Sequence, residues 1–196
     1  MGNSIGKLFN VTSFGESHGQ CVGVIVDGCP AGLAISKTDI QKEVDRRRAS
    51  QSIASTGRRE EDRVEILSGV FNGFTSGAPI CLLIRNQDVD SSDYERIKHL
   101  LRPSHADHIA FVKYGGFNDY RGGGMFSGRI TVTYVMAGAI ARRLLRLLGI
   151  EILAHTVEIG GIKASSVKYE KIKSAADKNP LRCADPIAAA KMAELI

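Results

Sequence analysis

The residue pattern of this chain predicts an α+β fold. Its 196 residues fit one domain, and an apolar fraction of 43% is enough to fill a core. The predicted strands and helices do not alternate regularly, which favours α+β over a doubly wound parallel sheet. The apolar stretch from Ile130 to Ala141 adds one long helix that we expect to be buried.

The first 50 residues contain one clear strand and one clear helix. Cys21–Asp27 is rich in β-branched residues and bounded by glycine, as in a buried strand. Ser36 is a suitable N-cap and Asp39 follows three residues later. A helix is therefore expected over Lys37–Arg47.

A pair of strands is expected next. Val64–Leu67 and Ile80–Ile84 are short apolar runs, and the turn residues between them include Asn72-Gly73. Turns of this kind connect neighbouring antiparallel strands. We therefore expect the two runs to pair in a hairpin-like arrangement.

The second half of the chain predicts three helices and one strand. Asp107–Lys113 is expected to form a short helix, and Gly128–Leu148 a long one that ends at Gly149. Ile150–Ile159 is expected to be a strand. Pro in the first turn marks the beginning of a helix over Pro186–Ile196.

Composition limits the classes of partner and the location. The net charge of +5 and the pI of about 9.1 favour an anionic partner. The four cysteines lack C-x-x-C spacing, so neither a zinc site nor a disulfide framework is predicted, and a reducing cytoplasm is expected. Arg142 and Arg143 interrupt the long apolar helix short of the ~20 residues that span a membrane, so no membrane partner is expected.

The first candidate motif is Gly15-Glu16-Ser17-His18-Gly19. It satisfies G-x-S-x-G, the nucleophile elbow of α/β-hydrolases, but that elbow needs a helix after the serine and here a strand is predicted. An ordinary turn between glycines is a second interpretation. The third, which we favour, is a flexible turn that presents the Ser17 hydroxyl and the His18 imidazole to a ligand.

The second motif is the segment from Arg102 to His108, in which His105 and Asp107 stand close to the arginine. His105, Asp107 and His108 do not have a standard metal-ligand spacing, so no metal site is predicted. The setting favours acid/base work by an imidazole. His99 and His155 lack such a setting and are taken as structural.

The third motif is the run of three glycines Gly122–Gly124. It leads into a helix expected to begin near Ser127, where backbone N–H groups and the helix dipole suit an anion. The run is neither a Walker loop nor a dinucleotide-binding fingerprint, and a plain glycine-rich turn is the alternative. The flanking Arg121 and Arg129 favour anion binding.

A run of arginines could bind either nucleic acid or a compact anionic ligand. Nucleic acid would call for aromatic side chains interleaved with the charges, and none occurs within the run. Arginine suits bidentate recognition of phosphate and carboxylate, so a compact anionic ligand is preferred and no nucleic acid is expected. The run consists of Arg46, Arg47, Arg48, Arg58, Arg59 and Arg63.

Together these segments resemble the chorismate synthase family from one end of the chain to the other. The resemblance rests on several motifs in the same order rather than on any one of them. It is carried by Gly2–Gly6, Thr12–Gly19, Val26–Pro30, Asp45–Arg48, Ile66–Val70, Arg102–Asp107, Tyr114–Gly116, Asp119–Gly124 and Ser127–Arg129.

The resemblance implies an enzyme, a carbon–oxygen lyase. The family carries out a trans-1,4-elimination of phosphate from 5-enolpyruvylshikimate 3-phosphate, which gives chorismate for aromatic amino-acid biosynthesis and requires reduced FMN. By resemblance, His18 protonates the departing phosphate and His105 lies near the reduced flavin. NADPH is a possible reductant of the flavin.

The resemblance also implies a set of binding residues. The flavin is expected at Met125, Phe126 and Ser127, where this chain has a less polar pair than is common, and Arg47 lies where the family is sometimes assigned nicotinamide contacts. Ile53 stands where many members have arginine, which puts a contact there in doubt. The substrate is expected to contact Ser17, Arg47, Arg102, Gly128 and Arg129.

The family further implies a layered β-α-α-β sandwich, a homotetramer and a cytoplasmic location. Residues 1–196 are expected to form one chorismate synthase domain that is truncated on its C-terminal side. Members of the family continue well beyond the position of Ile196. Further flavin contacts and an acidic residue for hydrogen removal are therefore expected outside this sequence.

Overall fold

The computed structural model describes residues 3–48, 60–87 and 89–196. These residues fold into two compact units. The first unit contains the described residues up to Leu148, and the second contains residues 149–196. Ile53, Arg58 and Arg59, which the sequence singled out, lie outside the described residues.

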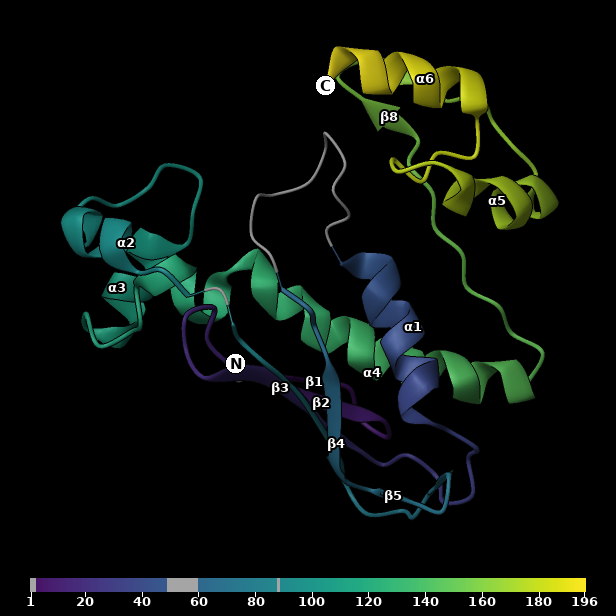
Figure 1. Cartoon of the computed structure of the whole chain (residues 1–196), viewed down its shortest axis with the longest axis horizontal. Helices are drawn as coiled ribbons and strands as arrows, with labels where there is room; N and C mark the ends of the chain where they lie inside the picture. Colours follow the sequence, from purple (N-terminus) through teal and green to yellow (C-terminus); the bar gives the residue numbers. More distant parts are fainter. Residues whose placement is uncertain (1–2, 49–59, 88) are drawn as a thin grey trace. The chain divides into compact units, whose positions relative to one another are not determined.

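The first unit is built on a five-stranded antiparallel sheet with the order β1-β2-β3-β7-β4 (Figure 1). Its central strand is β3, the predicted strand Cys21–Asp27. The expected pairing is confirmed, since the strand at Val64–Ser68 lies beside the strand at Ile80–Arg85. The other members are β1 (Ser4–Ile5), β2 (Asn10–Gly15), β4 (Val64–Ser68) and β7 (Ile80–Arg85).

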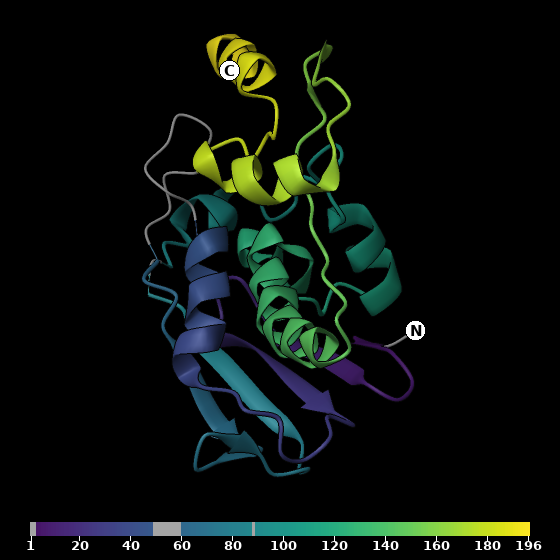
Figure 2. The same ribbon diagram turned by 90° about the vertical axis from the view of Figure 1, so that its right-hand side faces the viewer.

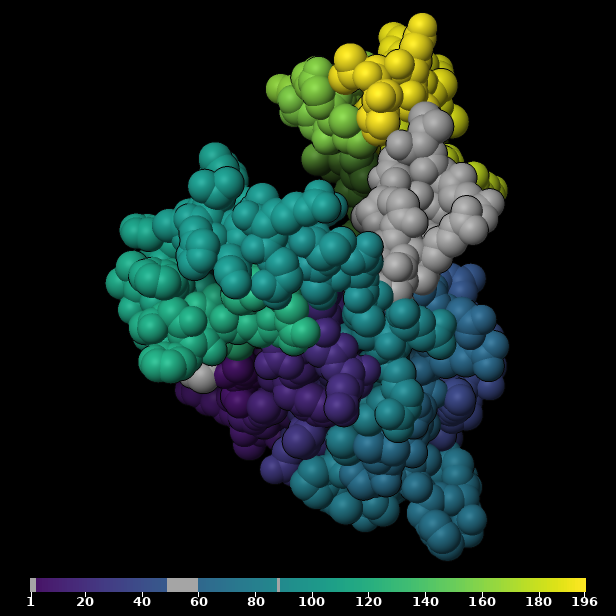
Figure 3. Space-filling view, turned by 60° about the vertical axis from the view of Figure 1, so that its left-hand side comes forward, coloured from purple at the N-terminus to yellow at the C-terminus, as the bar shows by residue number. Residues whose placement is uncertain are grey.

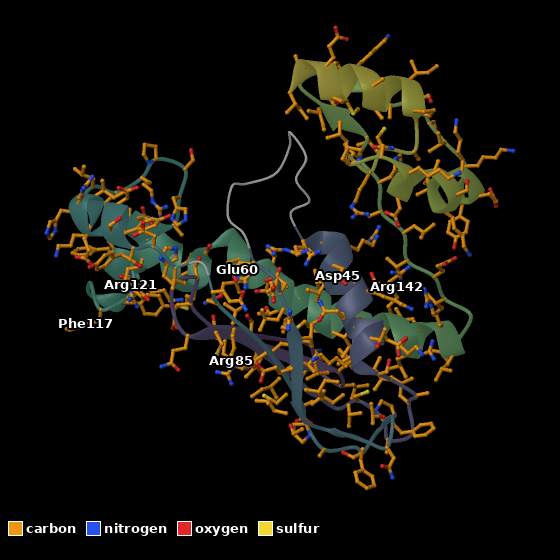
Figure 4. The ribbon with its side chains drawn as sticks, in the orientation of Figure 1. Asp45, Glu60, Arg85, Phe117, Arg121 and Arg142 are labelled. Atoms are coloured by element: carbon orange, nitrogen blue, oxygen red, sulfur yellow. The ribbon has the colours of Figure 1, made fainter. Side chains whose placement is uncertain are left out.

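Two helices cover one face of this sheet, α1 (Lys37–Arg47) and α4 (Thr131–Leu147), as Figure 2 shows. The capping box of α1 is formed as predicted, because Ser36 and Asp39 bond to each other's backbone N–H. Arg142 of α4, labelled in Figure 4, donates to Glu43 of α1 over 2.6 Å.

The core of the first unit lies between the helices and the sheet. The valines of β3 alternate inward, so Val22, Val24 and Val26 are fully buried and meet Met136 and Ile140 of α4. The predicted long helix is therefore confirmed, although it begins as a short 3₁₀ turn at Gly128–Ile130 and exposes Tyr134. The α+β class is confirmed as well.

Smaller elements complete the first unit. A hairpin of β5 (Val70–Phe71) and β6 (Phe74–Thr75) interrupts the β4–β7 connection at the predicted Asn-Gly turn. Helix α3 (Asp107–Tyr114) confirms the predicted short helix, and α2 (Ser92–Ile97) was not predicted. Figure 3 shows the α2–α3 part beside the N-terminal strands.

The second unit has a small core of its own. A two-stranded hairpin, β8 (Glu158–Ile159) and β9 (Ile162–Lys163), precedes α5 (Tyr169–Ala175) and a 3₁₀ turn at Ala176–Lys178. Helix α6 (Pro186–Leu195) confirms the predicted helix.

Most of the predicted strand Ile150–Ile159 is wrong. Only its last two residues pair, as β8, and the residues before them form no ladder. Apolar residues in an extended segment become a strand only where a neighbouring strand offers hydrogen bonds. Thr156 instead donates its backbone N–H to the Arg182 carbonyl and its hydroxyl to the Leu181 carbonyl, contacts to a loop that form no strand pairing.

Candidate active site

The Ser17–His18 turn connects β2 to β3 at one end of the sheet. The Ser17 side chain is buried, and its backbone N–H donates to the Gly124 carbonyl over 3.1 Å. The Asn86 amide holds the turn from the other side by donating to the carbonyls of Glu16 and Gly19 over 3.0 and 2.9 Å. A strand follows this turn, so the nucleophile-elbow interpretation fails on geometry.

The three glycines form a left-handed turn that brings the two candidate histidines together. Their φ angles are 57°, 83° and 53°. Residues other than glycine adopt such positive φ values only at a cost in free energy. A Cβ on Gly122 would lie 2.2 Å from His18 Cδ2, and one on Gly123 would lie 2.8 Å from His105 Nε2. The sequence predicted a glycine turn for the approach of a ligand, whereas here the turn also packs on both imidazoles.

His18 is held by neutral and aromatic neighbours. Its Nδ1 lies 2.9 Å from Ser91 Oγ, and the Tyr94 ring meets the imidazole edge to face at 5.1 Å between centroids. The other ring nitrogen, Nε2, lies on the side of Gly122. The ring is therefore fixed in orientation next to the glycine turn.

His105 is held by charged neighbours. Its Nδ1 lies 2.6 Å from Asp107 Oδ1 and 3.2 Å from the Arg102 guanidinium. Nδ1 can donate to the carboxylate or accept from the guanidinium, but not both, and the shorter distance favours donation to Asp107. Nε2 of His105 then lies on the side of Gly123.

Arg102 and Asp107 form a bidentate ion pair beneath His105. Arg102 Nε and Nη2 donate to the carboxylate over 2.7 and 2.8 Å, and the Arg102 backbone N–H adds a third bond. The Arg102 hydrogen bonds hold the pKa of Asp107 well below its usual range. The same pair raises the pKa of Arg102, so both groups keep their charges near neutral pH.

Arg129 is a buried cation at the beginning of the long helix. Its guanidinium donates from Nε to Asn86 Oδ1 over 3.0 Å and from Nη1 to the buried Asp62. Its Nη2 lies 3.8 Å from Glu60 and has no hydrogen-bond partner among the described residues. A buried, unpaired guanidinium nitrogen is costly unless a further acceptor is supplied.

Arg47 reaches the same acidic group from α1. Its Nη1 lies 3.7 Å from Asp62, and its Nη2 donates to the Gly128 carbonyl and to Thr131. Asp62 has a φ of 50°, which is uncommon for a residue with a side chain. The structure thus brings together Arg47, Gly128 and Arg129, three residues for which the family resemblance implies substrate contacts, and it shows Asp62 between the two arginines.

Met125 and Phe126 lie at a cavity of about 280 Å³. Tyr114 and Phe126 both line it and contact each other as a tilted pair, with 6.3 Å between their ring centroids. Ser127, predicted beside them, accepts the Arg129 backbone N–H over 3.3 Å and so caps the turn that begins the long helix. The remaining lining residues are Glu16, Phe117, Asn118 and Asp119.

The acidic residue before the glycine turn is neutralised locally. Asp119 accepts three hydrogen bonds from Arg121, two from the guanidinium and one from the backbone N–H. Arg121 is labelled in Figure 4 close to α2 and α3. These bonds lower the pKa of Asp119. Arg121 was predicted to favour anion binding, but its guanidinium is already committed to Asp119.

Several residues of this region were missed in the sequence. Asn86 directly follows a strand and Ser91 directly precedes a helix, so each has an ordinary local explanation that concealed its long-range contacts. Asp62 and Glu60 lie in an acidic run next to arginines, a pattern typical of surface charge. A buried Asp62 is visible only in three dimensions.

The remaining histidines lie outside this arrangement. His99 and His108 are exposed, and His155 belongs to the second unit. No group of three or more His, Cys, Asp or Glu residues in the described ranges could hold a metal ion. Among the same ranges, no helix is long and apolar enough to cross a membrane.

The fold and the site define a class of protein: an α+β protein with two histidines at a glycine turn and two arginines beside it, an arrangement that suits a compact anion. Known proteins narrow this class. The chain belongs to the chorismate synthase family, which matches residues 9–196.

Individual relatives agree with this assignment. The chorismate synthase of Dehalococcoides mccartyi strain BAV1 is 57% identical over 196 residues, which cover 100% of this chain and 54% of the relative. The chorismate synthase of Methanocella arvoryzae is 52% identical over 191 residues, covering 97% and 51%. A crystal structure of chorismate synthase superimposes with a TM-score of 0.67 and 29% identity, covering 97% of this chain and 53% of that one. The chain thus spans about half the length of the curated relatives it matches.

Proposed function

We propose that this chain supplies part of the active site of a chorismate synthase. The reaction is the trans-1,4-elimination of phosphate from 5-enolpyruvylshikimate 3-phosphate, which yields chorismate. The single observation that carries the proposal is the position of His18 and His105 against two consecutive glycines of one turn, with Arg102 next to His105. Two imidazoles at one turn suit a reaction in which a proton and a negative charge are handled together.

Anion binding is assigned to the arginines. The substrate carries a phosphate and two carboxylates, and Arg129 has a buried Nη2 without a hydrogen-bond partner among the described residues. The Glu60 carboxylate lies 3.8 Å from that nitrogen, so a substrate anion would replace Glu60 as its partner. Arg47 and Arg102 are assigned substrate contacts by family resemblance, although Asp62 and Asp107 already pair with them. Ser17 and the Gly128 backbone N–H are assigned by the same resemblance.

Proton transfer is assigned to His18. Its Nδ1 is occupied by Ser91, and its Nε2 lies on the side of the glycine turn. A protonated Nε2 would donate to the departing phosphate as the C–O bond breaks, so that phosphate leaves with less charge. His105, held by Asp107, is assigned to balancing negative charge rather than to passing the proton.

Reduced FMN fits part of the cavity at Met125 and Phe126. Tyr114, Phe117 and Phe126 offer aromatic surface to a flat ring system at the edge of this cavity, although Tyr114 and Phe126 already contact each other. Glu16 and Asp119 at the same cavity do not suit a phosphate, so other groups must hold that end of the cofactor. When bound, reduced FMN supplies electron density to the substrate as phosphate departs and recovers it as hydrogen leaves.

Further properties belong to the same proposal. All four cysteines are free, which supports a reducing cytoplasm. A homotetramer and NADPH as the reductant of the flavin are proposed from family membership. Arg47 remains a candidate nicotinamide contact, although its guanidinium already bonds Gly128 and Thr131.

The proposal is tested with the longest natural chain that carries this sequence. It is mixed without oxygen with 5-enolpyruvylshikimate 3-phosphate and reduced FMN, and chorismate and free phosphate are measured. Equal amounts of both products are expected with reduced FMN and none with oxidised FMN. Phosphate release without chorismate would indicate a phosphatase instead and would contradict the proposal.

A further inference from the structure

Ser91 stands at the N-cap of α2 but does not cap it. Serine is favoured at this position because its hydroxyl usually accepts a backbone N–H from the first turn. Here the Ser91 side chain makes no cap hydrogen bond, and its φ of −105° and ψ of 2° differ from the extended backbone typical of an N-cap. Its Oγ lies 2.9 Å from Nδ1 of His18 instead, 73 residues away in the sequence.

The His18 imidazole is enclosed on three sides. Ser91 and Tyr94 contact it from the α2 segment, and Gly122 packs against its Nε2 and Cδ2. The charged groups near the ring are Asp90, which precedes α2, and Asp119, which precedes the glycine turn; both carboxylates interact with His18. Asp119 is already paired with Arg121, and Asp90 accepts from the Ser92 backbone N–H. Ser91 is the hydroxyl that contacts Nδ1 itself.

We propose that Ser91 is a positioning residue that keeps Nε2 of His18 directed toward the glycine turn in both charge states of the ring. This inference rests on the proposed role of His18 as proton donor. A hydroxyl can accept Nδ1–H while the ring is protonated and can donate to Nδ1 after the ring becomes neutral. Rotation of the Ser91 hydroxyl about its C–O bond therefore keeps the contact while the Nε2 proton moves to phosphate. A solvent proton later restores the protonated ring.

The contact also has a preferred charge state. A hydrogen bond from a protonated imidazole to a hydroxyl is stronger than one between neutral groups. Ser91 therefore stabilises the protonated ring more than the neutral ring. Removal of the hydroxyl should make His18 lose its proton at lower pH.

The test compares Ser91→Ala, Ser91→Thr and Ser92→Ala in the longest natural chain that carries this sequence. The dependence of kcat on pH is measured for each variant. The same profile for His18→Ala shows which of its limbs reports the protonation of His18. Ser91→Ala should lower kcat at neutral pH about tenfold, as for a misoriented catalytic group, with KM little changed. The limb that His18→Ala abolishes should move to lower pH. Ser91→Thr should restore both values, and Ser92→Ala should match the wild type.

The outcomes separate the inference from the proposed function. A wild-type kcat and profile in Ser91→Ala, or equal loss in Ser91→Ala and Ser91→Thr, would overturn the positioning role while His18 remained essential. A fully active His18→Ala would instead refute the role of His18 in the proposed function. The ¹⁵N shift of His18 Nδ1, which needs no activity, should change in Ser91→Ala but not in Ser92→Ala. An unchanged shift would overturn the contact itself.

Discussion

Two segments place a histidine against the glycine turn, the Ser17–His18 turn and the Arg102–Asp107 loop. The groups that contact the two imidazoles differ in charge. His18 is held by a hydroxyl and an aromatic ring, at Ser91 and Tyr94. His105 is held by an ion pair, at Arg102 and Asp107. The two rings therefore differ in the hydrogen-bond partner of Nδ1, a hydroxyl at His18 and a carboxylate at His105. We propose different roles for them as well, proton donation for His18 and charge balance for His105.

The largest expected effect is the loss of the proton donor. His18→Ala in the full enzyme should lower turnover by roughly 10²-fold or more, because proton transfer to the leaving phosphate is lost. Steady-state chorismate formation measures it, with folding checked by circular dichroism. His99→Ala removes an exposed histidine and should leave turnover close to that of the wild type. A rate near that of the wild type for His18→Ala would contradict the role of His18 as proton donor.

The next effect concerns the glycine that packs on His18. Gly122→Ala would place a Cβ 2.2 Å from the imidazole at a φ of 57°, so it should lower the free energy of unfolding by about 1–2 kcal/mol and displace His18. Urea unfolding and turnover measure both effects. Gly138→Ala, in α4 with no atom within 4 Å of the new Cβ, should instead stabilise by up to about 1 kcal/mol. Equal behaviour of the two variants would show that the turn tolerates a side chain.

The sequence contained most of the reacting groups but not their supports. Ser17, His18, Arg102 and His105 stand in short motifs whose residue types reveal their chemistry. Ser91 contacts His18 from 73 residues away, and Asn86 holds the same turn through Glu16 from 70 residues away. No local pattern marks such contacts.

In the fold as well, elements with local sequence signals were predicted, and an element that depends on distant contacts was not. The helices with strong caps, Lys37–Arg47 and Pro186–Leu195, were predicted because their stop and start signals are local. The strand expected over Ile150–Ile159 was wrong because a strand depends on a distant partner. The α2 helix was missed because it is six residues long and buries none of them, so the sequence has no apolar periodicity there.

A third variant tests whether the ion pair between Arg102 and Asp107, beside His105, stabilises the fold through its charges. The pKa of Asp107 is lowered in the folded state, so its ion pair stabilises the fold above the unfolded value of about 4 and loses this effect as pH falls below it. Asp107→Asn should therefore be less stable than the wild type at pH 7, and the difference should shrink below about pH 4. Urea unfolding across this range measures it. Asp93→Asn, at an exposed carboxylate, should show no such trend, and a pH-independent difference in Asp107→Asn would contradict the ionic account.

The smallest expected effect lies at the cavity beside the glycine turn. Met125→Ala should weaken reduced FMN binding by no more than about threefold, equivalent to about 0.7 kcal/mol, because backbone groups are expected to carry the contact at this position. Phe126→Ala should weaken it more, since its ring supplies aromatic surface to the cavity. Anaerobic fluorescence titration ranks the two, and a larger effect at Met125 would contradict the expectation that backbone groups carry the contact there.

One measurement separates the two histidines directly: single-turnover phosphate release from 5-enolpyruvylshikimate 3-phosphate as a function of reduced FMN concentration. His18→Ala should lower the maximal rate and leave the half-saturating flavin concentration unchanged, because it removes the proton donor. His105→Ala should raise the half-saturating concentration, because it removes the group assigned to balancing the negative charge of the flavin. The reverse pattern, or equal curves for both variants, would contradict the division of roles that their neighbours imply.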